Sequence, residues 1–279
     1  MYRRTATLGL AATLALTSCG TQRAGAPPAP APRYEASVTV LEGHGHGPQL
    51  CAAVAESLPP RCGGPDVVGW DWKAVAHESQ SGVRWGSYRV VGTWDGARLT
   101  LTEPPGAPER ETPPGEDFSS PCPAPEGGWR PVDPARATQP ALEQAIARAG
   151  TAKEFAGAWV DQDYLGERGA DSPDANDPAR LVLNLRFTGD LSDREAWIRE
   201  VWGGALCVSG ARRTEAELNS IQEQVQSGLG EAMITASSSV LRNQVEVGVW
   251  LVTEEQRRAA DERYGAGAVV FDSVLRPVG

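Results

Sequence analysis

The alternation of apolar and polar positions is most regular in the last hundred residues. A period of two predicts a strand in RLVLNLRFTG, whose apolar face comprises Leu181, Leu183, Leu185 and Phe187. In a capping box, paired side chains satisfy the first backbone N–H groups of a helix. Three such boxes are predicted after this strand, at Ser192–Glu195, Thr214–Glu217 and Thr253–Gln256. Each box agrees with an apolar stripe at helical spacing, so three helices are expected here.

These elements predict the fold of the C-terminal region. From Leu206 onward their order is strand, helix, strand, strand, helix, strand, which is that of a ferredoxin-like βαββαβ domain. An additional strand and helix lead into it. We therefore expect a ferredoxin-like α+β domain over residues 179–279.

The pattern in residues 34–102 predicts a small β-rich domain. ASVTVLE alternates at a period of two, and GSYRVVGTWDGARLTLTEP predicts a hairpin around Asp95-Gly96, because Asp-Gly favours tight turns. A short helix is expected over residues 51–57. The overall fold class is therefore α+β, with a β-rich N-terminal domain ahead of the ferredoxin-like one.

Two segments connect these regions. Residues 103–134 contain ten prolines, which exclude helices and central strands and so predict a connector. Residues 135–178 are expected to form a helix, with Thr138 as N-cap, followed by an acidic loop.

The first eighteen residues have the pattern of a signal peptide. Arg3 and Arg4 precede an apolar run over residues 6–16, shorter than the roughly twenty residues that a membrane-spanning helix needs. The run ends in the motif LTSC, which resembles a bacterial lipobox. The resemblance implies cleavage after Ser18 and a diacylglyceryl group on Cys19. The alternative is an ordinary secretory signal that leaves Cys19 as a free thiol.

Composition agrees with a protein anchored outside the cytoplasm. Residues 19–33 form a Pro/Ala-rich tether that favours extended structure, so we expect a lipid-anchored protein on the outer face of the cell membrane. A hydrophobic fraction of 41% suffices for a packed core. The net charge of −10 argues against nucleic acid as a partner.

Four further cysteines predict two disulfides, because an even number outside the cytoplasm is typical of cross-linked proteins. Three connectivities are open. We favour Cys51–Cys62 and Cys122–Cys207. The alternative leaves Cys207 as a buried free thiol.

Two resemblances accompany these patterns. HGPQLCAAVAESLPPRCGGPDVVGWDW, LNLRFTGD, WGGALCV and ERYGAGAVV resemble a group of uncharacterised actinobacterial lipoproteins, which implies a cell-envelope setting and no activity. The final hairpin, helix and strand, with ERYG before AVVFD, are similar to prosegments of α-lytic-type serine proteases.

Candidate ligand sites are few. Three histidines, His44, His46 and His77, could hold Zn or Cu, or they belong to a surface loop. The loop from Asp161 to Pro178 could bind calcium through its oxygens, but it lacks the EF-hand spacing, and a solvated loop is the favoured interpretation. Its polar residues are Asp161, Asp163, Asp171, Asp174, Asn176 and Asp177. We predict no metal and no cofactor.

Nine tryptophans are numerous for this length, and four lie in the β-rich region: Trp70, Trp72, Trp85 and Trp94. If these side chains are exposed, they would stack on sugars or on a partner. If they are buried, they form part of the hydrophobic core, which is the favoured interpretation. The sequence contains no nucleophile elbow, zincin helix, phosphate loop or Ser-x-x-Lys motif.

The expected function is non-catalytic binding of an envelope protein or wall polymer by a protein anchored through Cys19. An envelope hydrolase that uses acidic residues is the first alternative. A metal-binding lipoprotein that uses His44, His46 and His77 is the second. An enzyme is the less favoured interpretation.

Overall fold

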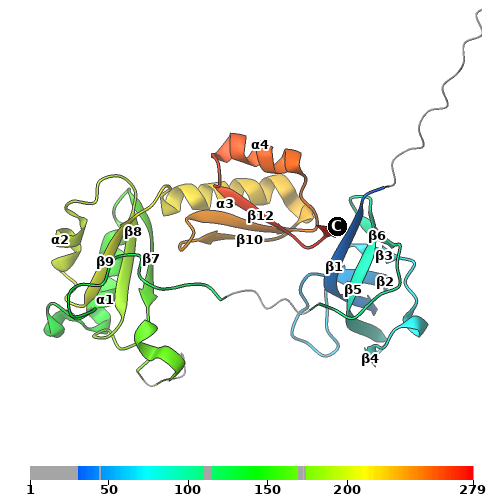
Figure 1. The fold of residues 1–279 in the computed structure, drawn as a ribbon, viewed down its shortest axis with the longest axis horizontal. Helices are drawn as coiled ribbons and strands as arrows, with labels where there is room; N and C mark the ends of the chain where they lie inside the picture. The colour runs from blue at the N-terminus through cyan, green and yellow to red at the C-terminus, as the bar shows by residue number, and fades with distance from the viewer. Residues whose placement is uncertain (1–30, 44, 110–114, 169–171, 173, 279) are drawn as a thin grey trace, which may run out of the picture. The chain divides into compact units, whose positions relative to one another are not determined.

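A computed structural model describes residues 31–43, 45–109, 115–168, 172 and 174–278 (Figure 1). The chain divides into the units Met1–Ala31 and Pro32–Gly279, and every element described here belongs to the second. Its described strands form one seven-stranded and two three-stranded sheets, with helices on the smaller ones. The fold is therefore α+β, as expected. No described helix has the length and apolarity to span a bilayer.

The N-terminal sheet closes on itself. Its strands are β1 (Arg33–Gly43), β2 (His46–Cys51), β3 (Asp66–Val68), β4 (Glu78–Gln80), β5 (Val83–Trp94), β6 (Arg98–Leu101) and β13 (Arg276–Pro277). Because β1 pairs with both β2 and β5, the order β1-β2-β3-β6-β5-β1 is a ring, so the sheet forms a small barrel. Within the ring, β3 and β6 run parallel and the other pairs antiparallel.

Alternation along the strands fills this barrel. Ala36, Val38 and Val40 of β1 point inward and are buried together with Val90 of β5. Leu275, just before β13, is fully buried in the same core, although it lies far along the chain. The β-rich region thus extends beyond residue 102, because its core requires a side chain from the C-terminal end.

The helix expected over residues 51–57 is absent from the described structure. Cys51 ends β2, and the following residues form bends and turns. Leu58 precedes Pro59-Pro60, and a residue before proline is disfavoured in the helical region. The apolar residues after Cys51 therefore do not extend into a helix, because the prolines end the segment after seven residues.

Residues 139–273 contain the same succession of elements twice. The first set is α1 (Gln139–Gly150), β7 (Phe155–Asp161), β8 (Val182–Phe187), α2 (Arg194–Arg199) and β9 (Ala205–Gly210). The second is α3 (Glu215–Leu229), β10 (Met233–Ser239), β11 (Gln244–Val249), α4 (Glu254–Tyr264) and β12 (Val269–Ser273). In both, the first two strands are antiparallel and the last two parallel. Each is therefore an αββαβ unit with its own sheet (Figure 1).

Short 3-10 turns lie at Trp72–Ala74, Pro134–Arg136, Asp163–Arg168 and Gly230–Ala232.

The ferredoxin-like prediction has the right order of elements but the wrong sheet. β9 does not join β10, β11 and β12; it pairs in parallel with β8, from Val182↔Ala205 to Phe187↔Gly210. The short crossover through α2 makes this pairing local, and β8 offers an almost wholly buried strand. The expected leading strand therefore takes β9 as its partner.

Both faces of the β7-β8-β9 sheet are covered. Helices α1 and α2 pack on one face, with Ala145 and Ile198 fully buried. On the other, Cys122 and Trp129 of the proline-rich segment pack against Val182. The disulfide Cys122–Cys207 fixes that segment, and Cys51–Cys62 closes a loop beside the barrel. The connectivity is the one favoured from the sequence.

Two of the three predicted capping boxes are present. Thr214–Glu217 and Thr253–Gln256 each make both reciprocal hydrogen bonds. The box expected at Ser192 is wrong, because α2 begins at Arg194 and the Ser192 hydroxyl donates to Asp190 instead. That local bond competes with capping of the helix.

Candidate functional site

The histidines give the metal hypothesis little geometric support. His46 is exposed at the start of β2, and His44 lies outside the described residues. Nδ1 of His77 lies 3.2 Å from the carbonyl oxygen of Val75, and its ring meets Trp72 edge-on at 5.1 Å. Among the described residues, no three His, Cys, Asp or Glu side chains gather as a metal site would require.

The acidic loop is divided among separate local contacts. Oδ2 of Asp161 accepts hydrogen bonds from the Ser120 amide and hydroxyl, both at 2.8 Å. Arg180 pairs with Asp174 at 2.8 Å, and Asp177 accepts from the Ala179 amide at 3.0 Å. Gln162 donates to Asn176 at 3.2 Å, and Asp171 lies outside the described residues. These contacts hold the loop together and do not direct the predicted oxygens to one point.

Asp161 and Asp163 are nevertheless coupled. Asp161 is 5% exposed, and its Oδ1 accepts from the Asp163 amide at 2.9 Å. The pKa of Asp163 is raised, first by the charge of Asp161, then by burial and by Asp117. A cavity of about 410 Å³ beside this pair is also lined by Ser120 and Tyr164.

This pKa shift predicts the effect of Asp163→Asn. Since the folded-state pKa exceeds the unfolded one, ionised Asp163 opposes folding at neutral pH, and the opposition disappears as the carboxyl is protonated. We expect Asp163→Asn to stabilise the protein at neutral pH and to have no effect once pH falls below the unfolded value of about 3.9. Urea unfolding at several pH values measures this. A gain that persists unchanged at low pH would contradict it.

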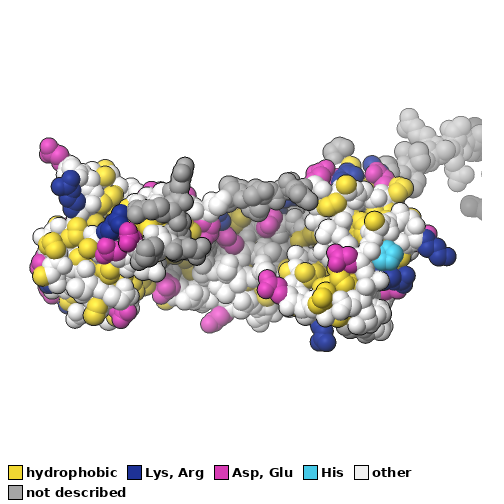
Figure 2. Space-filling view, turned by 90° about the horizontal axis from the view of Figure 1, so that it is seen from below, with side chains coloured by type: hydrophobic (Ala, Val, Ile, Leu, Met, Phe, Trp, Pro, Cys, Tyr) yellow, Lys and Arg dark blue, Asp and Glu magenta, His cyan; other side chains and the backbone are white. Residues whose placement is uncertain are grey.

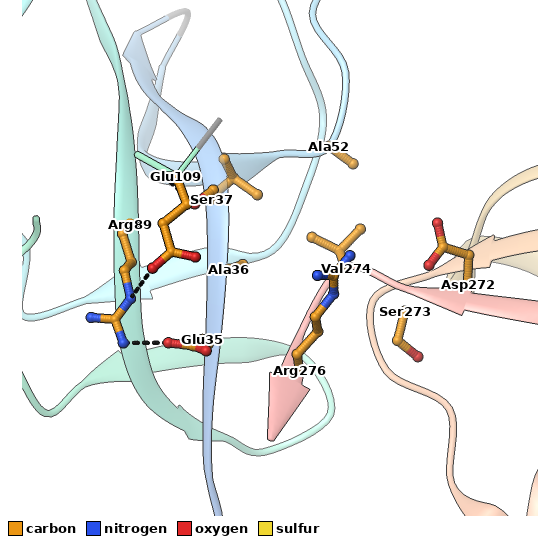
Figure 3. A pocket seen from close by; sticks show the side chains of 11 residues that line it. Glu35, Ala36, Ser37, Ala52, Arg89, Glu109, Asp272, Ser273, Val274 and Arg276 are labelled. Atoms are coloured by element: carbon orange, nitrogen blue, oxygen red, sulfur yellow. Dashed lines mark hydrogen bonds and ion pairs between the residues drawn. The ribbon is translucent and has the colours of Figure 1, made fainter. Parts of the chain in front are cut away.

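One cavity, of about 540 Å³, is charged (Figure 3). Arg89 on β5 forms ion pairs with Glu35 on β1 and with Glu109, the latter at 3.7 Å. Figure 3 shows Asp272 across the cavity from this group. Charges of both signs alternate around the opening and are largely paired at the Arg89 side, so no field of one sign faces a ligand.

A second cavity, of about 680 Å³, has a different lining. Its lining residues are glycines, alanines, Pro65, Met233, Ile234 and two half-buried tryptophans, Trp94 and Trp250. None of the described residues that line it is ionisable. We call this cavity the tryptophan cleft. It fits an uncharged ligand better than a charged one.

Local structure positions both indoles. Trp94 ends β5 immediately before the predicted Asp95-Gly96 turn, where Oδ1 of Asp95 accepts from the amides of Ala97 and Arg98 at 2.9 Å each. Gly96 supplies the positive φ of 100° that this turn needs.

Trp250 depends on a close approach at Gly64. A Cβ added to Gly64 would lie 1.9 Å from the Leu50 carbonyl oxygen and 3.3 Å from the Trp250 ring. Only glycine therefore allows the backbone and the indole to meet here. Neither indole N–H of Trp94 and Trp250 donates to another residue in the described part of the chain.

The disulfide-closed loop borders the tryptophan cleft. Ala52 and Ala53 line the cleft, and the same loop carries two exposed apolar side chains, Val54 at 41% and Leu58 at 71%. The cross-link Cys51–Cys62 restrains these residues before any partner arrives. This loop therefore extends the uncharged surface.

The tryptophans divide between core and surface. Trp72 is buried in the barrel and Trp70 meets it edge-to-face at 5.3 Å, and neither residue lies in a strand. Trp85 is half-buried beside the Cys51–Cys62 disulfide. Sequence reasoning missed that Trp94 and Trp250 line one cleft, although the Asp-Gly turn placed Trp94 at the end of a strand. No protein-family model and no curated protein sequence matches this chain.

Proposed function

We propose that this protein is a lipid-anchored, extracytoplasmic binding protein held at the membrane through Cys19, whose partner is an envelope protein or a wall polymer. The signal-peptide pattern, the lipobox-like LTSC and the Pro/Ala tether support the anchor. Two disulfides support an oxidising compartment outside the cytoplasm.

The tryptophan cleft carries the binding part of the proposal. Nucleophilic and acid–base catalysis need side chains that ionise or attack, and the described lining of this cleft offers none. Indole rings provide large, rigid contact surfaces and are enriched where binding energy concentrates. The geometry thus favours recognition of a partner over chemical conversion.

The barrel adds an argument by analogy. Its ring of five strands, with β3 parallel to β6, has the topology of an OB-type barrel, whose loops bind oligonucleotides and oligosaccharides. Fold alone does not determine function. The net charge of −10 disfavours the nucleic-acid branch of this analogy.

The anchor predicts a defined mass. Protein extracted from membranes should begin at Cys19, carry a diacylglyceryl adduct and lack four thiol hydrogens. Cys19→Ala should remove the adduct, because the thioether needs the sulfur. Intact mass spectrometry before and after reduction measures both. A chain that begins at Cys19 without lipid would contradict the anchor and leave a secreted protein.

Binding is tested with the mature, detergent-purified protein and delipidated cell walls. We expect the protein to sediment with walls, and Ala97→Glu to weaken this because it places a charge in the tryptophan cleft. Ala97 is exposed, so the variant should fold. Ala147→Glu, the same substitution on the exposed side of α1, is the matched control. Equal sedimentation of both variants would contradict a role for the cleft. In that case cross-linking in intact cells tests for a protein partner.

A second candidate, an envelope hydrolase, is supported by the raised pKa of Asp163 beside Asp161. Glycosidases use two carboxyl groups, one of which has a raised pKa and acts as the general acid. Asp163→Asn should then abolish release of soluble fragments from walls. Fragment release that is absent from the native protein, or unchanged in the variant, would remove this candidate.

A further inference from the structure

We propose that the tryptophan cleft binds an uncharged sugar segment of an envelope glycan. This inference rests on the proposed binding function and names its ligand class. Three properties of the cleft support it: its lack of charge, its unused hydrogen-bond donors and its place on the barrel.

The lining excludes strongly charged ligands. Charged residues make up 22% of the chain, yet none lines the cleft among the described residues. An ionic group that entered would lose hydration without gaining a counter-charge, which is unfavourable. On the face seen in Figure 2, acidic and basic side chains are interspersed, so no patch of one charge is visible there to attract a polyelectrolyte.

The unused donors argue against a purely aliphatic ligand. The N–H groups of Trp94 and Trp250 have no protein acceptor in the described structure, and glycine backbone is exposed along the cleft at Gly63 and Gly96. An acyl chain that covered these polar groups would leave them without a partner, at a cost in free energy. Hydroxyl and acetamido groups would accept from them.

A sugar ring combines the two features that the cleft offers. Its C–H face is apolar and packs on an indole, while its hydroxyl groups project from the edge and form hydrogen bonds. Trp94 and Trp250 are half-buried, so each ring is held by core packing and still presents surface. The binding surface is therefore organised in advance.

The position on the barrel agrees with this ligand. The Asp95-Gly96 turn joins β5 and β6, the fourth and fifth strands of the closed ring in chain order. The loop between the fourth and fifth strands of such barrels is one of those that bind oligosaccharides. Trp94, Gly96 and Ala97 bring this loop into the cleft.

The test is isothermal calorimetry on the mature protein in a zwitterionic detergent that carries no sugar. The probes are neutral trisaccharides, namely triacetylchitotriose, cellotriose and maltotriose, with anionic trigalacturonate and an uncharged Ala-Pro peptide for comparison. We expect at least one neutral trisaccharide to bind and trigalacturonate not to bind. Trp94→Ala and Trp250→Ala should each weaken binding about tenfold or more, in line with the loss of one ring-stacking contact.

Two further variants keep the test independent of folding. Ala97→Glu leaves both indoles in place and should also weaken binding, whereas Trp197→Phe, on α2 outside the cleft, should not. Absence of binding by all three neutral trisaccharides overturns the inference, as does binding that Ala97→Glu leaves unchanged. If the peptide binds instead, or if walls bind through the cleft without any sugar binding, the ligand class is wrong but the proposed function stands. Failure of both assays overturns both.

Discussion

Removing the Cys122–Cys207 disulfide should lower the free energy of unfolding by about 4–5 kcal/mol. The two cysteines are 85 residues apart, so the cross-link restricts a large part of the unfolded chain. In the folded state, Cys122 holds the proline-rich segment on the β7-β8-β9 sheet. The double variant Cys122→Ala/Cys207→Ala should also expose that face, and urea unfolding measures the change.

The second disulfide is a control within the same chain. Cys51 and Cys62 are only 11 residues apart, so Cys51→Ala/Cys62→Ala should cost less, about 3 kcal/mol. The free energy of unfolding should therefore be highest for the native protein, lower for the variant without Cys51–Cys62, and lowest for the variant without Cys122–Cys207. Equal losses would show that loop length does not determine the contribution of these cross-links.

Trp202→Ala should destabilise the protein by about 3–5 kcal/mol, the range for removal of a buried aromatic side chain. Trp202 is fully buried beneath α1 and α2, and its Nε1 donates to the Ala205 carbonyl oxygen at 2.9 Å. Gly204 is fitted to the ring, since a Cβ there would lie 2.1 Å from it. The substitution leaves both a cavity and an unpaired carbonyl.

Trp197→Ala provides the matched comparison, five residues earlier on α2. Trp197 is only half-buried and meets the guanidinium groups of Arg148 and Arg194 at 5.0 and 5.7 Å. Partly exposed contacts of this kind contribute about 1 kcal/mol. In chemical unfolding, the loss in free energy of unfolding should therefore be severalfold larger for Trp202→Ala than for Trp197→Ala. Similar losses in the two variants would contradict the prediction that burial determines the loss of stability.

Local chemistry made part of the fold predictable. The Asp95-Gly96 turn has its expected hairpin, because Asp95 satisfies two amides that the turn leaves open. Thr214 and Thr253 cap their helices for the same kind of reason. The even number of cysteines predicted two disulfides, and the favoured one of three open connectivities is present. In the turn and the caps, the interacting groups lie within a few residues of one another. The cysteines are farther apart, but the chemistry of the thiol restricts their partners to other cysteines.

Long-range choices were not predictable from these patterns. β9 has an apolar pattern that suits either neighbouring sheet, and the choice depends on packing against β8 and on the Cys122 segment. Trp94 and Trp250 are separated by more than half the chain, and no periodicity relates them. Their shared cleft depends on Gly64, whose importance appears only when the backbone of Leu50 and the Trp250 ring are placed.

The burial of Leu275 inside a barrel that starts at Arg33 sets an order of events for folding during synthesis. Strands β1 to β6 leave the ribosome long before Leu275 and β13 do, because synthesis runs from the N-terminus to the C-terminus. Until Leu275 is available, the barrel lacks a core side chain and the β13 pairing at Tyr34. The barrel therefore completes its core only after the two αββαβ units have been synthesised.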